Sequence, residues 1–214
     1  MTRYLAEIRK GYQQSSFKPA ELAIVPIVIF KKWFQDAQQA NTKERYWMLL
    51  APAGTIRMTS ARFILIRVIG ELVFIFYSDY TSKIKKELAI NLSAILFRFR
   101  HLLGGLVRLI GGLKEINRQD SDYYFRSQPN ESKIVRCTST QSKAKTNRLM
   151  LEHIFQNIRN NFKKRGLIPI LKNSGGYLVI RYVVKFWQGR QYRIQDLLQY
   201  IINGDRWKLN QATS

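Results

Sequence analysis

The sequence has few of the residues on which disulfide, thiol or metal chemistry depends. Cys137 is its one cysteine, so no disulfide can form within the chain, and we expect a reducing compartment and no catalytic thiol. His101 and His153 are its two histidines, too few for a histidine-rich metal site. We therefore predict neither a disulfide framework nor a bound metal.

Long apolar segments are also missing. The longest run, near residues 23–30, is interrupted by Pro26 and is far shorter than a membrane span requires. The first residues are polar and basic and show no apolar core of a signal peptide. We therefore expect a soluble, cytoplasmic protein with no membrane partner.

Acidic residues are scarce. The 14 Asp and Glu residues stand against 36 Lys and Arg, a formal net charge of +22. Such a surface attracts phosphate, whether on nucleic acid, on an anionic membrane or on a small ligand. The bases are scattered, so a diffusely solvated surface is the simpler alternative. We find no helix-turn-helix, zinc ligand set or aromatic-rich RNA motif, and we expect no nucleic-acid partner.

What is present suits a folded chain, since 46% of the residues are hydrophobic and 13% are aromatic. Helices are predicted from Pro26 to about residue 40, after a possible N-cap at Ser82, and over residues 120–127 and 147–164. Strands are predicted over residues 46–51, 60–68, 72–77, 94–99, 106–110, 183–187 and 192–202. Residues 128–145 and 165–176 are predicted loops, Gly111-Gly112 a bulge or a loosened strand end, and Asn203-Gly204 a hairpin turn. This order predicts an α+β fold with one antiparallel, barrel-like sheet and no linker between domains.

Cations and hydroxyls gather around two of the predicted strands. Arg62 and Arg67 lie within one strand, and Lys83 begins a helix after a Tyr77-Ser78 pair. Fixed cations, hydroxyls and a helix N-terminus are what a phosphate dianion requires. In the alternative interpretation the arginines belong to the solvated face; five residues apart on a strand they point to opposite faces, so at least one of them would be exposed.

The stretch from Val183 to Leu209 carries a resemblance to a known family. Residues 186–196 read F-W-Q-G-R-Q-Y-R-I-Q-D, and a hairpin ending in W-K-L follows. This pattern resembles the C-terminal signature of the pyridoxamine 5′-phosphate oxidase family. That resemblance implies flavin mononucleotide (FMN) as the cofactor, an α+β fold built on an antiparallel split β-barrel with flanking helices, and a homodimer.

Further segments resemble the family's motifs in the same order along the chain. They are I-R-x-x-Y at 8–12, V-P-I-x-x-F-x-x-W at 25–33, S-A-R-F-I-L-I-R at 60–67, F-Y-S-D-Y-x-S-K at 76–83, Y-F-x-S-Q-P-x-x-S at 124–132 and T-Q-S at 140–142. The resemblance implies two parts of the chain, an N-terminal segment 1–20 that covers the substrate and a single barrel domain 21–214.

Site residues follow from the resemblance position by position. The implied FMN contacts are Arg62, Phe63, Ile64, Leu65, Ile66, Arg67, Tyr77, Ser78, Lys83, Gln141, Ser142 and Trp187. The implied substrate contacts are Arg9, Tyr12, Arg67, Tyr124, Gln128, Ser132, Arg193 and Gln195. Arg193 would lie beside the reacting carbon, with Tyr12 and Arg9 closing the site. Tyr124 and Trp187 are also compatible with ordinary core positions.

The chain departs from the family pattern at several of these positions. Ile84 replaces a second base, Gly104-Gly105-Leu106 lacks a flavin-contacting Gln, Gln128 replaces an Arg that grips the substrate phosphate, Gln195 replaces a His, Leu197 replaces an Arg, Ser174 replaces a Trp, and Arg67 replaces a Lys. Each lost charged hydrogen bond is worth roughly 1.5–3 kcal/mol.

The resemblance leads to one main functional hypothesis, FMN-dependent oxidation of pyridoxamine or pyridoxine 5′-phosphate to pyridoxal 5′-phosphate with O2 as acceptor. A second is a catalytically impaired relative that binds FMN or pyridoxal phosphate weakly. A third, a basic nucleic-acid-binding protein, is supported by the net charge alone.

Overall fold

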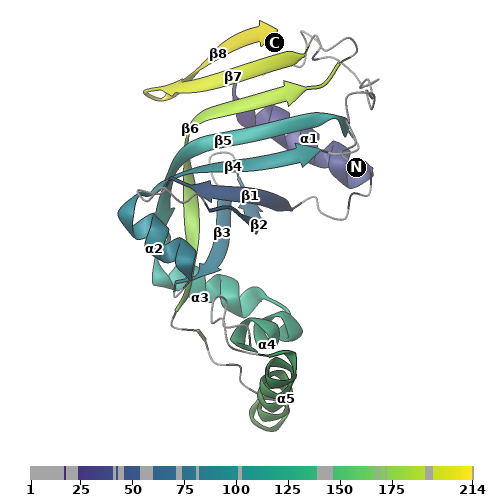
Figure 1. Cartoon of the computed structure of the whole chain (residues 1–214), viewed down its shortest axis with the longest axis vertical. Coiled ribbons are helices and arrows are strands. Elements are labelled where there is room, and N and C mark those ends of the chain that lie inside the picture. The colour runs from purple at the N-terminus through teal and green to yellow at the C-terminus, as the bar shows by residue number, and fades with distance from the viewer. Residues whose placement is uncertain are drawn as a thin grey trace, which may run out of the picture.

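The computed structural model describes residues 17, 24–40, 42, 46–53, 60–70, 74–80, 82–100, 103–138, 147–166, 168, 170–171, 173–190 and 195–213. Their strands form one antiparallel sheet in the order β3-β2-β1-β4-β5-β6-β7-β8, in which β3 also pairs with β6. That extra pairing closes β3, β2, β1, β4, β5 and β6 into a six-stranded barrel, from which β7 and β8 extend (Figure 1). The predicted antiparallel split barrel with flanking helices is therefore confirmed.

The strands are β1 Trp47–Pro52, β2 Arg62–Ile69, β3 Phe74–Asp79, β4 Ser93–Arg100, β5 Gly105–Glu115, β6 Ser174–Gln188, β7 Asp196–Asn203 and β8 Arg206–Thr213. The helices are α1 Pro26–Gln39, α2 Lys83–Ile90, α3 Arg118–Ser127, α4 Asn130–Thr138 and α5 Arg148–Arg165. Within the described part of the chain, no helix is both long and apolar enough to cross a membrane.

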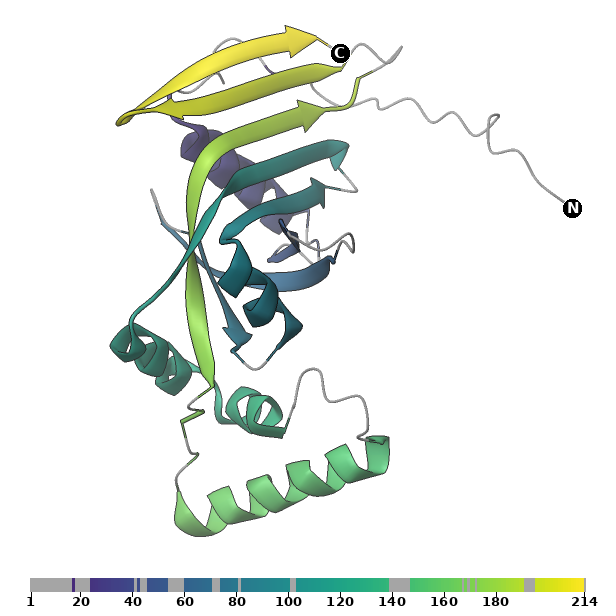
Figure 2. The same cartoon turned by 60° about the vertical axis from the view of Figure 1, so that its left-hand side comes forward.

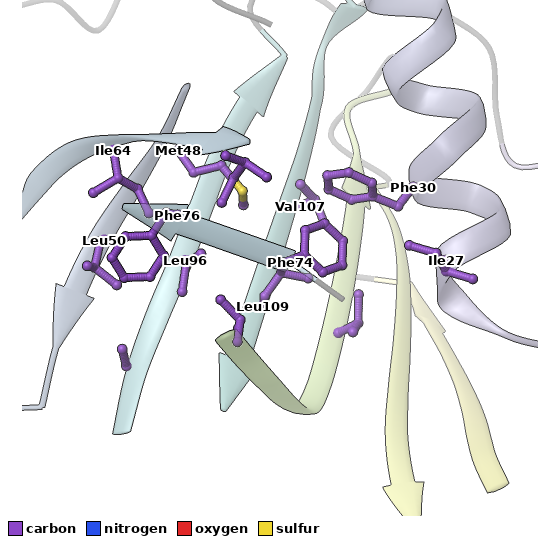
Figure 3. Packing of buried hydrophobic residues seen from close by; sticks show 14 of the residues in the cluster. Ile27, Phe30, Met48, Leu50, Ile64, Phe74, Phe76, Leu96, Val107 and Leu109 are labelled. Atoms are coloured by element: carbon purple, nitrogen blue, oxygen red, sulfur yellow. The ribbon is translucent and has the colours of Figure 1, made fainter. Parts of the chain in front are cut away.

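Alternating apolar side chains fill the barrel. Leu50, Phe76, Leu96 and Phe186 are fully buried, and each comes from a different strand. Figure 3 shows several of these side chains turned toward one another between the strands. Burial of each is worth about 1.5–3 kcal/mol, so the core holds the strands that carry the candidate site in fixed register.

Strand β6 is the longest strand and takes part in two different pairings. Its first part pairs with β3, with Tyr77 opposite Gly176, and its last part pairs with β7, with Trp187 opposite Leu197. The strand bends between the two parts (Figure 2). The bend accompanies a register shift after Ile110, which confirms the predicted glycine bulge, but β5 continues beyond it to Glu115. A Cβ atom at Gly111 would clash with the carbonyl oxygen of Ile180.

Helices lie at both ends of the barrel. Helix α1 lies at one end, and Ile27, Phe30, Trp33 and Ala37 form its buried face, as their spacing predicts. Helices α3, α4 and α5 lie at the other end, beyond the start of β6 (Figure 1). The two ends therefore differ in what covers them.

Two predicted loops are wrong in part. Helix α4 lies inside the predicted loop 128–145, with Glu131 in its first turn and Arg136 in its last, a charge order that suits the helix dipole. Strand β6 begins at Ser174, inside the predicted loop 165–176. Gly175 and Gly176 are strand residues because they pair with Ser78 and Tyr77 of β3, and a Cβ atom at either position would clash with the neighbouring side chains. The predicted hairpin is confirmed, but Asn203 pairs with Arg206, so the turn lies one residue later.

Candidate functional site

The end of β3 and the start of α2 bring buried hydroxyls to a helix N-terminus. Ser78 is buried, and Ser82 occupies the N-cap position of α2, as predicted. The Ser82 side chain makes no capping hydrogen bond, and its fully buried hydroxyl has no hydrogen-bond partner among the described residues. A buried hydroxyl without a partner is unfavourable by about 1–3 kcal/mol, so this site lacks an acceptor or donor that a ligand could supply.

The charge at this helix N-terminus is positive. The first turn of α2 contains no acidic residue. Lys83 opens the helix with an exposed side chain, which lies 3.6 Å from Glu87 one turn later. Such an exposed pair contributes little to stability and leaves Lys83 able to turn toward an anion.

On the outer side of β3, Tyr77 stacks on Tyr124 of α3. The ring centroids are 3.6 Å apart and the rings are 11° from parallel. The stack depends on Gly176, which pairs with Tyr77 across the sheet, because a Cβ atom there would lie 2.9 Å from Tyr77 Cε1. Burial, followed by the neighbouring Tyr124 and Asp120, raises the pKa of Tyr77 to about 12, so its hydroxyl remains a hydrogen-bond donor at neutral pH.

Arg136 of α4 lies beside this aromatic pair. Its guanidinium carbon is 5.8 Å from the centre of the Tyr77 ring. Burial lowers the pKa of Arg136, and the Arg67 cation lowers it further. Arg67, which was predicted as a site residue, and Arg136, which was not, therefore lie in the same region. Arg136 is not among the predicted site residues, because its segment is polar and was predicted to be a loop. Pro129 before Asn130-Glu131 is the signal that could have revealed the helix.

The predicted flavin strand 62–67 divides between the barrel core and its outer surface. Ile64 and Ile66 are buried in the core, so only their backbone could contact a ligand outside the barrel. Phe63 is 67% exposed and Arg67 is also exposed, whereas Arg62 is half-buried. Arg62 and Arg67 therefore have different environments, as their spacing predicts.

Two other predicted site residues lie elsewhere. Trp187 is near the end of β6, far along that strand from Gly176 and Tyr77, and it is flanked across the sheet by Leu106 and Leu197. Gln195 precedes β7 at the same end, and its Oε1 accepts a hydrogen bond of 2.8 Å from the backbone N–H of Arg190. A single chain therefore does not bring Trp187 and Gln195 together with Tyr77 and Tyr124. Neither Trp187 nor Tyr124 belongs to the buried core.

The space beside Gly105 is filled by other residues. A Cβ atom at Gly105 would lie 3.0 Å from the Trp33 ring and 3.1 Å from Gln188 Oε1. The Gln188 amide donates hydrogen bonds to the carbonyl oxygens of Leu103 and Gly104, both 3.1 Å long. The turn before β5 is thus stabilised by Gln188, at the place where the resemblance leads one to expect a flavin-contacting glutamine.

The remaining predicted site residues lie outside the described residues. They are Arg9, Tyr12, Gln141, Ser142 and Arg193. Phe17 is the described residue of the segment 1–20. Its ring stacks on the Trp33 ring with 5.7 Å between the centroids, and its backbone N–H donates a hydrogen bond of 3.2 Å to Asp196 Oδ2. Ser132 is exposed on α4, one turn before Arg136, and Gln128 forms the C-cap of α3.

The donors at the start of α2 fit the phosphate of FMN. The Ser82 hydroxyl needs a partner, the helix N-terminus attracts an anion, and Lys83 supplies a cation. On β2, which pairs with β3, the exposed Phe63 and Arg67 offer an apolar surface and a cation. This end of the barrel can therefore hold a phosphorylated ligand and an aromatic ring side by side.

Comparisons with known proteins agree with this geometry. No family model matches the chain. The pyridoxine/pyridoxamine 5′-phosphate oxidase of Trichormus variabilis is 32% identical over 214 residues, which cover 100% of both chains. PhzG from Burkholderia lata 383, solved in complex with tetrahydrophenazine-1-carboxylic acid, has a TM-score of 0.84 at 22% identity over 95% of this chain and 100% of that one. A pyridoxamine 5′-phosphate oxidase-related, FMN-binding protein from Nostoc punctiforme has a TM-score of 0.68 at 11% identity, over 90% of this chain and 98% of that one.

Proposed function

Since the chain belongs to the pyridoxine/pyridoxamine 5′-phosphate oxidase family, we propose that it oxidises pyridoxamine or pyridoxine 5′-phosphate to pyridoxal 5′-phosphate. When bound, FMN supplies the acceptor for the hydride that leaves the C4′ carbon, and O2 is the final acceptor. The observation that carries the proposal is the buried Ser82 hydroxyl at the positive N-terminus of α2, for which no described residue is a hydrogen-bond partner.

We assign the proposed residue roles to two ligands, FMN with its phosphate and the phosphorylated substrate. Ser78, Ser82 and Lys83 hold the FMN phosphate, with the helix N-terminus adding its dipole. Arg67 and the outer surface of β2 lie along the flavin. Tyr124 positions the substrate through its stack on Tyr77. Arg193 is proposed beside the reacting carbon, and residues 1–20, with Arg9 and Tyr12, as the cover of the site.

We further propose that the active protein is a homodimer. Trp187 lies at the opposite end of β6 from Tyr77, so the proposed flavin residues can meet only if two chains contribute. Exposed aromatic and aliphatic side chains on the outer barrel surface support this, since Trp47 and Phe63 are in ring contact at 5.6 Å and Ile95 and Phe99 lie on nearby β4. Contiguous apolar surface of this kind marks protein interfaces. The cytoplasmic location and the lack of a nucleic-acid partner stay predictions from the sequence.

The test is the visible absorption spectrum of the purified protein, followed by an oxygen-consumption assay with pyridoxine 5′-phosphate. We expect a yellow protein, or one that becomes yellow after incubation with FMN, and oxygen uptake that depends on the substrate. A protein that stays colourless after FMN addition and gel filtration contradicts the proposal. Ser93 is an exposed serine outside the site, so the S93A variant provides a matched control for variants of Ser78 or Ser82.

One observation favours the second candidate, a relative that binds flavin or pyridoxal phosphate without efficient oxidation. The space at Gly105 is filled by Trp33 and Gln188, and Trp187 has apolar neighbours, Leu106 and Leu197, where the resemblance implies polar flavin contacts. Weak flavin absorbance and no oxygen uptake at saturating FMN would favour this candidate. Turnover at micromolar FMN would exclude it.

A further inference from the structure

Arg136 is a half-buried cation for which the described part of the chain provides no ion-pair partner. The structure gives its guanidinium no hydrogen bond and no ion pair with any other described residue. By contrast, the buried Arg100 of β4 lies 3.0 Å from the carboxylate of Asp36. The C-terminal dipole of α4 offers Arg136 only a partial negative charge, so a bound anion would still compensate for the hydration that the guanidinium loses on burial.

The surroundings of Arg136 are more favourable to an anion than to another protein group. Arg67 adds a second cation to the same region, and Asp79 is the weakest of the groups that influence Arg136. Arg136 also lies over the ring of Tyr77, which stacks on Tyr124. Two cations beside a rigid aromatic pair form a site for a ligand that joins an aromatic ring to an anionic group.

The position of Arg136 on α4 links it to the predicted phosphate-binding motif. Ser132 precedes Arg136 by one helical turn, so both side chains project from the same face of α4. Gln128 lies just before this helix, at the C-cap of α3, and carries a neutral amide in place of the arginine that the family pattern has there. The cation missing at Gln128 is thus present one helix further along the chain.

We propose that Arg136 binds the phosphate group of the substrate and takes the place of the arginine lost at Gln128. The inference rests on the proposed function for the identity of the phosphate ester. Arg136 is a binding and specificity residue in this assignment, with Ser132 and the Tyr77–Tyr124 pair as its neighbours. Its planar fork can donate two hydrogen bonds to phosphate oxygens, which a glutamine amide cannot match in charge.

The test is calorimetric titration with 4-deoxypyridoxine 5′-phosphate, which cannot be oxidised at C4′ and forms no Schiff base with lysine. The same titration is made with unphosphorylated 4-deoxypyridoxine, on protein as purified and after FMN addition. The variants are R136Q, R136K, the rescue variant Q128R/R136Q and the control R126Q. Arg126 is exposed in the last turn of α3. Thermal unfolding of each variant checks its folding.

We expect R136Q to bind the phosphate ester about 10- to 100-fold more weakly than the unmodified protein. Binding of the unphosphorylated compound should not change, because a merely structural role of Arg136 would weaken both ligands alike. R126Q should match the unmodified protein, R136K should lie between, and Q128R/R136Q should regain affinity for the phosphate ester.

The outcomes separate this inference from the proposed function. R136Q that binds the phosphate ester as tightly as the unmodified protein overturns the inference, even if the protein oxidises pyridoxine 5′-phosphate. If the unmodified protein binds the phosphate ester selectively, R136Q loses that selectivity and no turnover is detected, the inference is supported and the oxidase proposal is contradicted. If the unmodified protein binds both compounds equally, the inference is contradicted, and so is the proposal that a phosphate ester is the substrate.

Discussion

Arg100 and Arg136 are two guanidinium groups, each placed over an aromatic ring, at opposite ends of the barrel. Arg100 faces α1: its guanidinium carbon is 4.1 Å from the centre of the Trp33 ring, and its Nη2 atom is 3.0 Å from Asp36 Oδ2. Arg136 has a looser contact with its ring, 5.8 Å from Tyr77, and no carboxylate within ion-pair distance among the described residues. The first arginine has a counterion, and the second has none among the described residues.

The difference separates a structural arginine from a ligand-binding one. Burial lowers the pKa of Arg100 to about 10, while Asp36 acts in the opposite direction, so the protein itself compensates part of the desolvation. Burial also lowers the pKa of Arg136. A second cation lowers the pKa at both sites, Arg98 beside Arg100 and Arg67 beside Arg136, but only at Arg100 does a hydrogen-bonded carboxylate among the described residues oppose it. The α1 end of the barrel therefore supplies Arg100 with a carboxylate, whereas an anion beside Arg136 would take that part at the α3–α4 end.

The largest effect is expected from Asp36→Ala, which leaves Arg100 as a buried cation without its carboxylate. We expect the free energy of unfolding to fall by about 2–4 kcal/mol, toward the lower part of the range for buried pairs because Asp36 is partly exposed. Urea denaturation measures it. Glu152→Ala breaks the exposed Arg148–Glu152 pair and should change stability by less than about 0.5 kcal/mol. Equal effects of the two variants would remove the distinction between the ends of the barrel.

Gly176→Ala should disturb the α3–α4 end. The new Cβ atom would lie 2.6 Å from Ile116 Cδ1 and 2.9 Å from Tyr77 Cε1. We expect a loss of about 1–3 kcal/mol in unfolding free energy and weaker binding of the phosphate ester, because Tyr77 must move. Ile116→Val removes the Cδ1 atom, so the double variant should regain part of the stability but not the binding. Full recovery of binding would show that the Tyr77 position is unimportant.

Ser82→Ala should have opposite effects on the empty and the FMN-loaded protein. Without FMN we expect a gain of about 1 kcal/mol in unfolding free energy, since an unpartnered buried hydroxyl is removed. FMN affinity should fall roughly tenfold, the value of one hydrogen bond to a charged group. Fluorescence quenching of added FMN measures the affinity, with S93A as the control. An unchanged affinity would separate Ser82 from the flavin phosphate.

The smallest effect concerns alkaline pH. The pKa of Tyr77 in the folded protein is about 12, above its ordinary value of 10, so the folded state holds the phenolic proton more tightly than the unfolded state. The stability due to this proton is fully present below about pH 10 and is lost as the pH rises toward 12. Tyr77→Phe should therefore make the unfolding free energy fall less steeply above pH 10 than in the unmodified protein. Identical slopes in denaturation experiments would contradict the burial of the Tyr77 hydroxyl.

Much of the barrel could be predicted from local pattern. Apolar spacing located α1, and turn residues separated β1 to β5 to within a few residues. Closure of the barrel could not be read in this way, because it depends on the pairing of β3 with the first part of β6, whose glycines read as a loop. Gly175 and Gly176 belong to a strand through their pairing with β3, a long-range effect, and the close approach of Tyr80 and Ile116 leaves room for glycine only.

The candidate site could be predicted where it follows a motif, and not where it depends on packing between helices. The order of motifs pointed to Tyr77, Ser78, Lys83 and Tyr124, which the structure gathers at one end of the barrel. Arg136 matches no motif of the family, and its position beside Tyr77 depends on the fold of α4 against that end. The distance along β6 between Trp187 and the residue that pairs with Tyr77 could not be predicted either, because it depends on the register of the sheet.

Anaerobic mixing of the FMN-loaded protein with pyridoxine 5′-phosphate is the decisive experiment, because transfer of hydride to the flavin abolishes its visible absorption. We expect complete bleaching by the phosphate ester, little bleaching by pyridoxine, and bleaching of the R136Q variant only at much higher ester concentrations. A flavin that stays oxidised at every concentration of the ester, or a protein that takes up no FMN, would contradict the proposed function.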